Sequence, residues 1–205
     1  QVKSILINAS SLKLIYKYLE RNPTEATNVK LESIISTAEI LPEDIRKPLG
    51  KILDCQVRSM YANQENGIMA IQDGDGKEYY FDTSTYVIEV LKLDSDEPAA
   101  KGEIGRLVIT DLYNYAFPLI RYENGDMGII LKQVEGDKYR VYLEEISGRI
   151  TDLIYDSYGR LLSPSAVNIR MWVSKGIKQF QFIQVDEKKY LLKINPESGP
   201  VDEKA

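Results

Sequence analysis

The chain has 205 residues, 43% of them hydrophobic and 28% charged, and a formal net charge of −5, which is typical of a globular protein of one large or two small domains. No apolar run approaches the roughly 20 residues that span a bilayer, and the acidic balance without a dense Lys/Arg stripe argues against nucleic acid as the main partner. Histidine is absent, which excludes His-based triads and His metal sites within the chain. The one cysteine, Cys55, cannot form a disulfide within the chain, so we expect a reducing, cytoplasmic compartment and interpret Cys55 as a small buried residue.

The first part of the chain alternates helix and strand patterns. Residues 10–21 carry apolar side chains at i, i+3, i+4 and i+7, which predicts one buried helix face with Ser10 or Ser11 as the N-cap. Three further elements follow in order, a strand at 31–37, a helix at 42–53 and a strand at 55–61. This order predicts an α/β layer with parallel strands.

After Gly67 the pattern changes to strand-like runs separated by turn residues, which predicts an antiparallel sheet or a small distorted β-barrel. A hairpin is expected at 152–163 with its turn near 156–159, then a helix at 163–176 and two closing strands. The predicted fold class is therefore mixed α/β (α+β): the end of a parallel layer, a small antiparallel barrel and a partial α/β piece.

The stretch "FPLIRYENGD", residues 117–126, begins as a strand-like apolar run, and we expect its Gly-Asp pair to follow at the end of that strand. Two interpretations are open. Asp126 caps its own backbone in a tight turn, or its carboxylate, made approachable by the preceding glycine, accepts hydrogen bonds from a vicinal diol such as a ribose.

The surrounding motifs bear on that choice. The strings "YANQENG" (61–67), "GEIGRLVITDLYNYAFPLIRYENGD" (102–126) and "ISGRITDLIYDSYGRLLSPSAV" (146–167) stand in this order and spacing. Together they resemble the adenylate-forming acyl-activating superfamily, and within it the phenylacetate-CoA ligase branch with its capsular polysaccharide biosynthesis relatives. The resemblance covers about 31–195 and favours a site over a turn.

The resemblance implies a division into three parts. Residues 1–92 would be the C-terminal part of the large adenylate-binding α/β domain, residues 93–148 a β-barrel-like subdomain, and residues 149–205 a truncated C-terminal lid domain. The chain has no initiator Met, so we expect it to be the C-terminal fragment of a longer protein.

The resemblance also assigns roles to individual residues. Tyr61 would stack on adenine, with a core tyrosine as the alternative; Glu65 would hold Mg²⁺, with a solvated loop acid as the alternative. Asp126 would bind the two ribose hydroxyls. Arg149 would contact the same nucleotide, with a surface arginine as the alternative, and Asp152 would be the hinge about which the lid rotates.

Two positions near these residues complete the expected site. Gln64 replaces the motif's Thr that meets the α-phosphate, and an amide can also donate a hydrogen bond there. Ala62 replaces a Gly. The segment around Ala38 and Glu39 resembles the strand end that lines the adenine pocket.

The resemblance implies an AMP-forming acyl-CoA ligase as the parent protein. It would join a small carboxylate to ATP with Mg²⁺, release pyrophosphate, and pass the acyl group from the acyl-adenylate to coenzyme A, in capsular polysaccharide biosynthesis by the nearest likeness. The Gly/Ser/Thr-rich triphosphate loop is absent from the 205 residues, and Lys204 is a poor match for the catalytic lysine. The chain alone is therefore expected to be inactive.

Two alternatives to an enzyme remain open. Because Gln64 departs from the motif, a non-catalytic relative could have kept the fold as a scaffold in polysaccharide assembly. A plain β-rich interaction domain without nucleotide is the other. The carboxylic acid and the oligomeric state are not indicated by the sequence.

Overall fold

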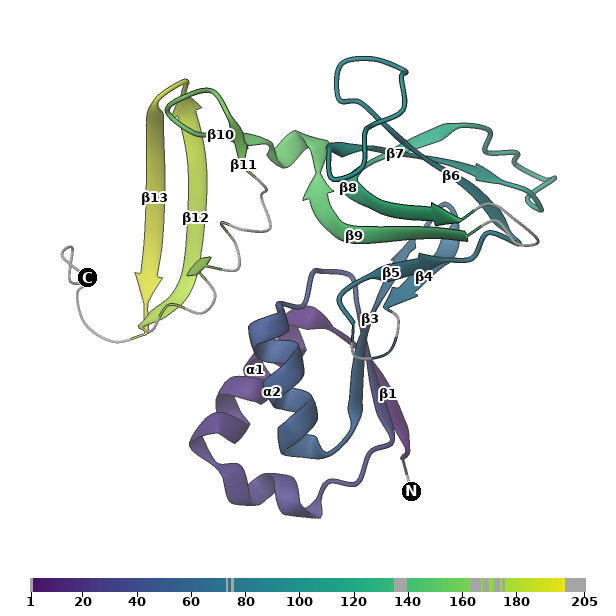
Figure 1. Ribbon diagram of the computed structural model, residues 1–205. Helices are drawn as coiled ribbons and strands as arrows, with labels where there is room; N and C mark the ends of the chain where they lie inside the picture. The colour runs from purple at the N-terminus through teal and green to yellow at the C-terminus, as the bar shows by residue number, and fades with distance from the viewer. Residues whose placement is uncertain are drawn as a thin grey trace. The chain divides into compact units, whose positions relative to one another are not determined.

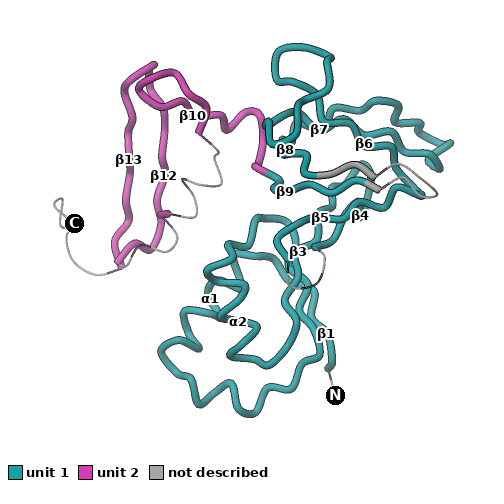
Figure 2. Tube along the Cα trace, in the orientation of Figure 1, with its two compact units in different colours: residues 1–146 teal, residues 147–205 magenta. Residues whose placement is uncertain are grey.

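Two units divide the chain, Gln1–Ile146 and Ser147–Ala205 (Figure 2). The computed structural model describes residues 2–72, 74, 76–134, 140–162, 167, 170, 171, 174 and 176–197. The predicted mixed α/β class is confirmed by a nine-stranded sheet, parallel at one end and antiparallel over the rest, in the order β1-β2-β3-β4-β5-β9-β8-β7-β6 (Figure 1).

The parallel part follows the predicted alternation. Its elements are β1 (Ser4–Asn8), α1 (Ala9–Arg21), the 3-10 helix η1 (Pro23–Asn28), β2 (Ser33–Thr37), α2 (Glu43–Leu53) and β3 (Gln56–Asn63). β1 pairs with β2 and β2 with β3, both in parallel. Helices α1 and α2 bury Leu12, Leu49 and Leu53 in one cluster with Ile34 and Val57 of the strands, so the helices cover one face of this part of the sheet (Figure 1).

Helix α1 begins one residue earlier than predicted, and its N-cap is Asn8. The Asn8 side-chain oxygen accepts a hydrogen bond from the Ser11 amide at 2.8 Å, so neither Ser10 nor Ser11 is the cap. An asparagine side chain at this position satisfies one of the amides that have no partner in the first helical turn.

Cys55 lies between α2 and β3 and is half-buried rather than fully buried. Burial, and then the charge of Asp54, raise the pKa of its thiol.

The antiparallel part adds six strands. They are β4 (Gly67–Gln72), β5 (Tyr79–Phe81), β6 (Tyr86–Leu91), β7 (Ile104–Asp111), β8 (Tyr122–Val134) and β9 (Arg140–Arg149). Their inner faces form a second cluster of buried residues that includes Met69, Phe81, Leu107, Ile109 and Leu143. The strand order ends openly at β6, so the predicted antiparallel sheet is present and the small distorted β-barrel is not confirmed.

This part of the sheet nevertheless curls. The hydroxyl of Tyr86 in β6 donates a hydrogen bond to the carbonyl of Asn66, in the turn between β3 and β4. β6 and β3 are far apart in the strand order, so the Tyr86 side chain rather than a strand ladder joins these two places.

The second unit contains two hairpins. η2 (Ile150–Asp152) leads into β10 (Ile154–Tyr155) and β11 (Leu161–Leu162), and β12 (Ile177–Asp186) pairs with β13 (Lys189–Pro196). The first hairpin turns through 156–160, close to the predicted turn. The helix predicted at 163–176 lies mostly outside the described residues, as does Lys204.

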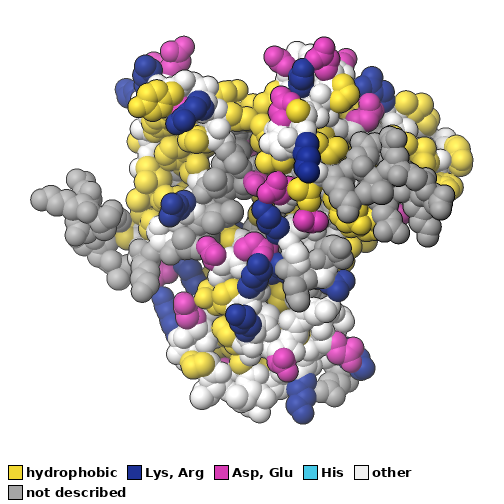
Figure 3. Space-filling view, viewed as in Figure 1, with side chains coloured by type: hydrophobic (Ala, Val, Ile, Leu, Met, Phe, Trp, Pro, Cys, Tyr) yellow, Lys and Arg dark blue, Asp and Glu magenta, His cyan; other side chains and the backbone are white. Residues whose placement is uncertain are grey.

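Within the described ranges, no helix combines the length and apolar character needed to cross a bilayer. On the face in Figure 3, Lys and Arg side chains alternate with Asp and Glu rather than forming one basic stripe.

Candidate functional site

The Gly-Asp pair lies inside a strand, at a β-bulge. In the register between β7 and β8, Leu107 faces three residues of β8, Asn124–Asp126, where regular pairing would place one. Gly125 takes a φ of 81°, which side-chain-bearing residues rarely adopt. β8 begins at Tyr122, so the expectation that the pair follows the end of a strand is wrong. The bulge comes near the strand's start.

The Asp126 carboxylate is held by a tyrosine from another strand. The Tyr61 hydroxyl donates to Asp126 Oδ2 at 2.7 Å, and Asn124 Nδ2 donates to the same hydroxyl at 2.6 Å. The Asp126 backbone amide donates to Asn124 Oδ1 at 3.0 Å. Asn124 therefore makes the side-chain bond to the backbone of the bulge, while the side chain of Asp126 reaches across to β3.

Tyr61 is deeply set in the antiparallel core. Its side chain is 9% exposed, and its ring packs edge-on against Phe81 with the centroids 5.9 Å apart. The core-tyrosine alternative describes this ring, because little of its face is accessible. Stacking on adenine stays a prediction.

Gln64 and Glu65 are exposed at the tip of the β3–β4 hairpin. Asn63 shapes this turn, because its Oδ1 accepts from the Asn66 amide at 2.6 Å. The Tyr122 hydroxyl donates to Glu65 Oε1 at 3.3 Å. The first strand residue of β8 is thus joined to the hairpin tip.

Two tyrosine–carboxylate pairs therefore link the same two segments in opposite directions. Tyr61 of β3 bonds Asp126 of β8, and Tyr122 of β8 bonds Glu65 of the β3–β4 turn. We name these four residues, together with Asn124, the tyrosine–carboxylate cluster. It brings together three predicted site residues, Tyr61, Glu65 and Asp126, and the sequence reasoning missed Tyr122 and Asn124.

The segment after β2 lies beside β3. The parallel ladder between β2 and β3 ends at the pair Ser36 and Ser59. Ala38 follows two residues after the end of this ladder, and Tyr61 follows two residues after it on β3. Ala38 has a φ of 70°, and the Ser10 hydroxyl of α1 lies 2.6 and 2.7 Å from the two carboxylate oxygens of Glu39. Glu39 is thus tied to α1, at the carboxyl end of a parallel strand, where ligands of α/β sheets commonly bind.

A buried lysine accompanies Glu39. Lys13 of α1 is 4% exposed. Burial lowers the pKa of Lys13, and the charge of Glu39 opposes that effect. Lys13 was not singled out from the sequence, because it reads as one polar residue among apolar neighbours of a helix.

Arg149 and Asp152 belong to the second unit and are described by themselves. Arg149 is exposed at the end of β9, after Gly148 with a φ of 94°. Asp152 is exposed at the end of η2, where its Oδ1 lies 3.3 Å from the Thr151 hydroxyl. It follows the unit boundary at Ser147 by five residues.

The fit to a metal ion depends on Glu65. Among the described residues, no group of three His, Cys, Asp or Glu side chains is arranged to hold a metal. Mg²⁺, however, is usually bound through one or two carboxylates together with substrate phosphates and water. An exposed glutamate at a hairpin tip fits that mode of binding, and does not fit a closed protein cage.

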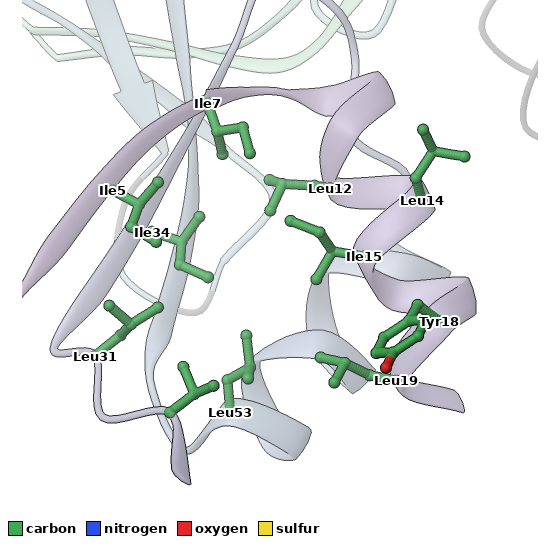
Figure 4. Close-up of a pocket in the computed structure, with 11 residues that line it drawn as sticks. Ile5, Ile7, Leu12, Leu14, Ile15, Tyr18, Leu19, Leu31, Ile34 and Leu53 are labelled. Atoms are coloured by element: carbon green, nitrogen blue, oxygen red, sulfur yellow. The ribbon is translucent and has the colours of Figure 1, made fainter. Parts of the chain in front are cut away.

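A separate apolar cavity of about 420 Å³ lies in the parallel part (Figure 4). It is lined by side chains from β1, α1, β2 and α2, among them Ile5, Ile7, Leu12, Ile34 and Leu53. None of the predicted nucleotide residues lines it, so it is distinct from the tyrosine–carboxylate cluster.

Comparison with known proteins gives relatives of one kind. No family model matches the chain. It is 25% identical over 175 residues to protein CapK of Staphylococcus aureus, covering 84% of this chain and 37% of CapK. It is 28% identical over 132 residues to phenylacetate-coenzyme A ligase of Thermus thermophilus, covering 62% of this chain and 29% of that protein. The chain thus spans about a third of the length of these curated relatives.

Two solved structures with the same fold are CoA ligases with an adenylate bound. A 2-hydroxyisobutyryl-CoA ligase in the postadenylation state with R3-HIB-AMP superposes with a TM-score of 0.73 at 17% identity, covering 94% of this chain and 43% of that one. The anthranilate CoA ligase AuaEII with anthranoyl-AMP gives 0.67 at 15% identity, covering 98% and 40%. The resemblance predicted from the motifs is therefore confirmed: the chain is similar in sequence to CapK and to a phenylacetate-coenzyme A ligase, and it has the fold of CoA ligases solved with bound adenylates.

Proposed function

We propose that the chain is the nucleotide-binding and hinge-bearing part of a cytoplasmic, AMP-forming ligase that converts a small carboxylate first to an acyl-adenylate and then to a coenzyme A thioester. One observation carries the proposal. Asp126 and Glu65, which the motifs assign to ribose and Mg²⁺, lie 61 positions apart in the sequence and are joined to the same two segments by Tyr61 and Tyr122.

The ribose contact is assigned to Asp126. Its carboxylate accepts hydrogen bonds only, and two hydroxyls of a diol can both donate to it. The bulge and Gly125 place this side chain away from the regular pairing of β8, which leaves room for a ligand to approach the backbone.

The phosphate contacts are assigned to the hairpin tip. The Gln64 amide can donate to an α-phosphate oxygen, and Glu65 can bind Mg²⁺ that also contacts the nucleotide phosphates. When bound, Mg²⁺ would stabilise the charge that develops on the α-phosphate. Both side chains are exposed and held on a short turn, which supports a role in orienting the phosphates.

The remaining roles come from the resemblance. Glu39 and Ala38 would border the adenine, Arg149 would contact the nucleotide, and Asp152 would be the backbone hinge of the lid. The position of Asp152 just after the start of the second unit supports the hinge. Coenzyme A as acceptor, and a role in capsular polysaccharide biosynthesis, are part of the same proposal.

The non-catalytic scaffold is the second candidate, because Gln64 departs from the motif's Thr at the phosphate position. Both candidates share the fold and differ in turnover. We further propose that the 205 residues alone bind nucleotide weakly and do not turn over, because neither a triphosphate loop nor a matching lysine is among them.

The test is ATP–pyrophosphate exchange by the natural full-length protein with aryl, fatty and sugar-derived acids. We expect one class of acid to drive exchange, and Asp126→Asn to reduce it about 100-fold, since charge-assisted hydrogen bonds to the ribose would be weakened. Glu25→Gln makes the same charge change at an exposed position on η1 and should leave exchange unchanged.

Two results would contradict the proposal. Exchange that is unaffected by Asp126→Asn would show that Asp126 does not bind the ribose. No exchange with any acid, by a protein whose circular dichroism shows it to be folded, would favour the scaffold.

A further inference from the structure

Asn124 makes two hydrogen bonds whose directions are fixed by chemistry. One end of its side-chain amide meets the Asp126 backbone N–H at 3.0 Å, and the other meets the Tyr61 hydroxyl at 2.6 Å. A backbone N–H can only donate, so the end facing it must be Oδ1, and the end facing Tyr61 must be the donor Nδ2.

The direction of the next bond follows. The Tyr61 oxygen accepts the Asn124 proton, and its own proton is directed to Asp126 Oδ2 at 2.7 Å. Asn124, Tyr61 and Asp126 thus form a closed ring of hydrogen bonds that begins and ends on the bulge. In such a ring each bond polarises and orients the next one.

The ring is anchored in the core by Tyr61. Because its side chain is 9% exposed and packs against Phe81, the hydroxyl cannot follow a carboxylate that moves. The bulge residues, by contrast, include Gly125, whose backbone is the most permissive of any residue. The position of the Asp126 carboxylate is therefore set by Tyr61 and Asn124 more than by the backbone that carries it.

We propose that Asn124 is a positioning residue for the ribose-binding carboxylate: acting through the Tyr61 hydroxyl, it orients Asp126 and so sets how strongly the site selects nucleotides that have ribose hydroxyls. This inference rests on the proposed function. It also gives Tyr61 a task, holding Asp126, that its buried hydroxyl performs whether or not the ring contacts adenine.

The test compares the affinity of the natural full-length protein for AMP and for 2′,3′-dideoxy-AMP. The affinity ratio, which is the affinity for AMP divided by the affinity for dideoxy-AMP, measures recognition of the ribose hydroxyls alone. Asn124→Asp retains the acceptor for the Asp126 amide but replaces the donor to Tyr61 with a second acceptor. We expect it to lower the ratio about tenfold, with the affinity for dideoxy-AMP little changed.

Two further variants separate this role from others. Tyr61→Phe removes the hydroxyl but keeps the aromatic ring. A lower affinity ratio in this variant therefore cannot result from lost stacking. In the Tyr61→Phe background, Asn124→Asp should have little further effect, because residues that act through one contact are not additive. Asn114→Asp is the matched control: Asn114 accepts from the Phe117 amide in a loop outside the cluster, and the ratio should not change.

A measurement without nucleotide tests the ring by itself. The carboxyl ¹³C resonance of Asp126 should shift in both Asn124→Asp and Tyr61→Phe, and not in Asn114→Asp. An unshifted resonance would show that the ring does not exist in solution and would overturn the inference.

The remaining outcomes distinguish the two proposals. Wild-type protein that binds AMP, with an unchanged ratio in Asn124→Asp, overturns the positioning role and leaves the proposed function intact. Equal weakening of both nucleotides means a general structural effect and also overturns it. Wild-type protein that binds neither nucleotide overturns the proposed function, and with it the role of Asn124 in selecting ribose.

Discussion

The parallel and antiparallel parts of the first unit are held together over different distances along the chain. In the parallel part, side-chain bonds between elements span 11 positions from Arg46 to Val57 and 29 positions from Ser10 to Glu39. In the antiparallel part, Tyr61 and Asp126 are 65 positions apart, and Tyr122 and Glu65 are 57 apart. The first part is assembled from neighbouring elements, whereas the candidate site depends on the curl of the whole sheet. We therefore expect substitutions in the two parts to lower the free energy of unfolding by different amounts.

We expect the largest difference in the free energy of unfolding between two Gly→Ala substitutions, one in each part. A Cβ at Gly105 of β7 would lie 2.2 Å from the Leu91 carbonyl oxygen and 2.8 Å from a Val90 methyl, so Gly105→Ala should cost about 3 kcal/mol or more. Gly50 lies in helix α2, where the closest contact would be 3.0 Å. The helix propensity of Ala, about 1 kcal/mol better than Gly, should offset much of that contact in Gly50→Ala.

Urea unfolding of the two variants checks this expectation through the change in the free energy of unfolding. Gly102→Ala is a useful third variant, because a Cβ there meets nothing within 4 Å but the backbone φ is 82°. It should cost about 1 kcal/mol from backbone strain alone. Equal losses at Gly105 and Gly50 would remove the distinction between the two parts.

Arg46 is expected to have the next largest effect, because it connects the parts. Its side chain is 3% exposed, pairs with Glu43 at 2.6 Å, and donates to the carbonyls of Val57 at 2.9 Å and Gly76 at 3.0 Å. Arg46→Met should lower the free energy of unfolding by about 3 kcal/mol, since the partly buried Glu43 carboxylate and two carbonyls lose their partner. Lys47→Met, which removes an exposed pair with the same glutamate at 3.2 Å, should cost at most about 0.5 kcal/mol.

Thermal or urea unfolding of both variants measures this contrast. If Arg46→Met were as harmless as Lys47→Met, the link between the parts would contribute little to stability, and the parts would be better regarded as independent.

A smaller, pH-dependent effect is expected at Glu43. Burial alone would raise the pKa of its carboxyl, but hydrogen bonds and charge from Arg46, and then from Lys47, hold the pKa below the ordinary value of 4.5. A carboxyl whose pKa is lowered by folding stabilises the fold above its unfolded pKa, and that contribution is lost as the pH falls through the folded pKa. Glu43→Gln should therefore be less stable than wild type at about pH 7, and the difference should shrink toward about pH 3.

Unfolding free energies of wild type and Glu43→Gln across this range give the measurement. A difference that stayed constant with pH would mean that the charge of Glu43 does not contribute, and that its hydrogen-bonding shape alone matters.

The parallel part could be predicted well from the sequence because its signals are local. The apolar period of α1 and the β-branched run of β2 identify those elements without knowledge of the fold. Strand β1 was missed because its apolar run, Ile5–Ile7, is only three residues long and lies at the edge of the sheet. The N-cap was misplaced because Asn8, Ser10 and Ser11 are all of residue types that commonly cap helices, and the apolar period alone does not choose among them.

The candidate site could be predicted only in part. Motifs pointed to Asp126 and Glu65 as a set, but not to the hydrogen bonds that hold them. Asn124 was missed because its role depends on the bulge, which exists only through the register of β7 with β8. An Asn-Gly pair is a signal for unusual backbone, and it could have drawn attention to this position.

The long-range tyrosine bonds also have a consequence for how the protein folds. Contacts between residues distant in sequence require closure of long loops and form slowly compared with local ones. When only the residues up to Phe81 have folded, Tyr61 and Glu65 are in place, but Asp126 and Tyr122 are not yet. The candidate site is thus completed only when β8 joins the sheet. Nucleotide binding, as proposed for this site, would then report that the antiparallel part has finished folding.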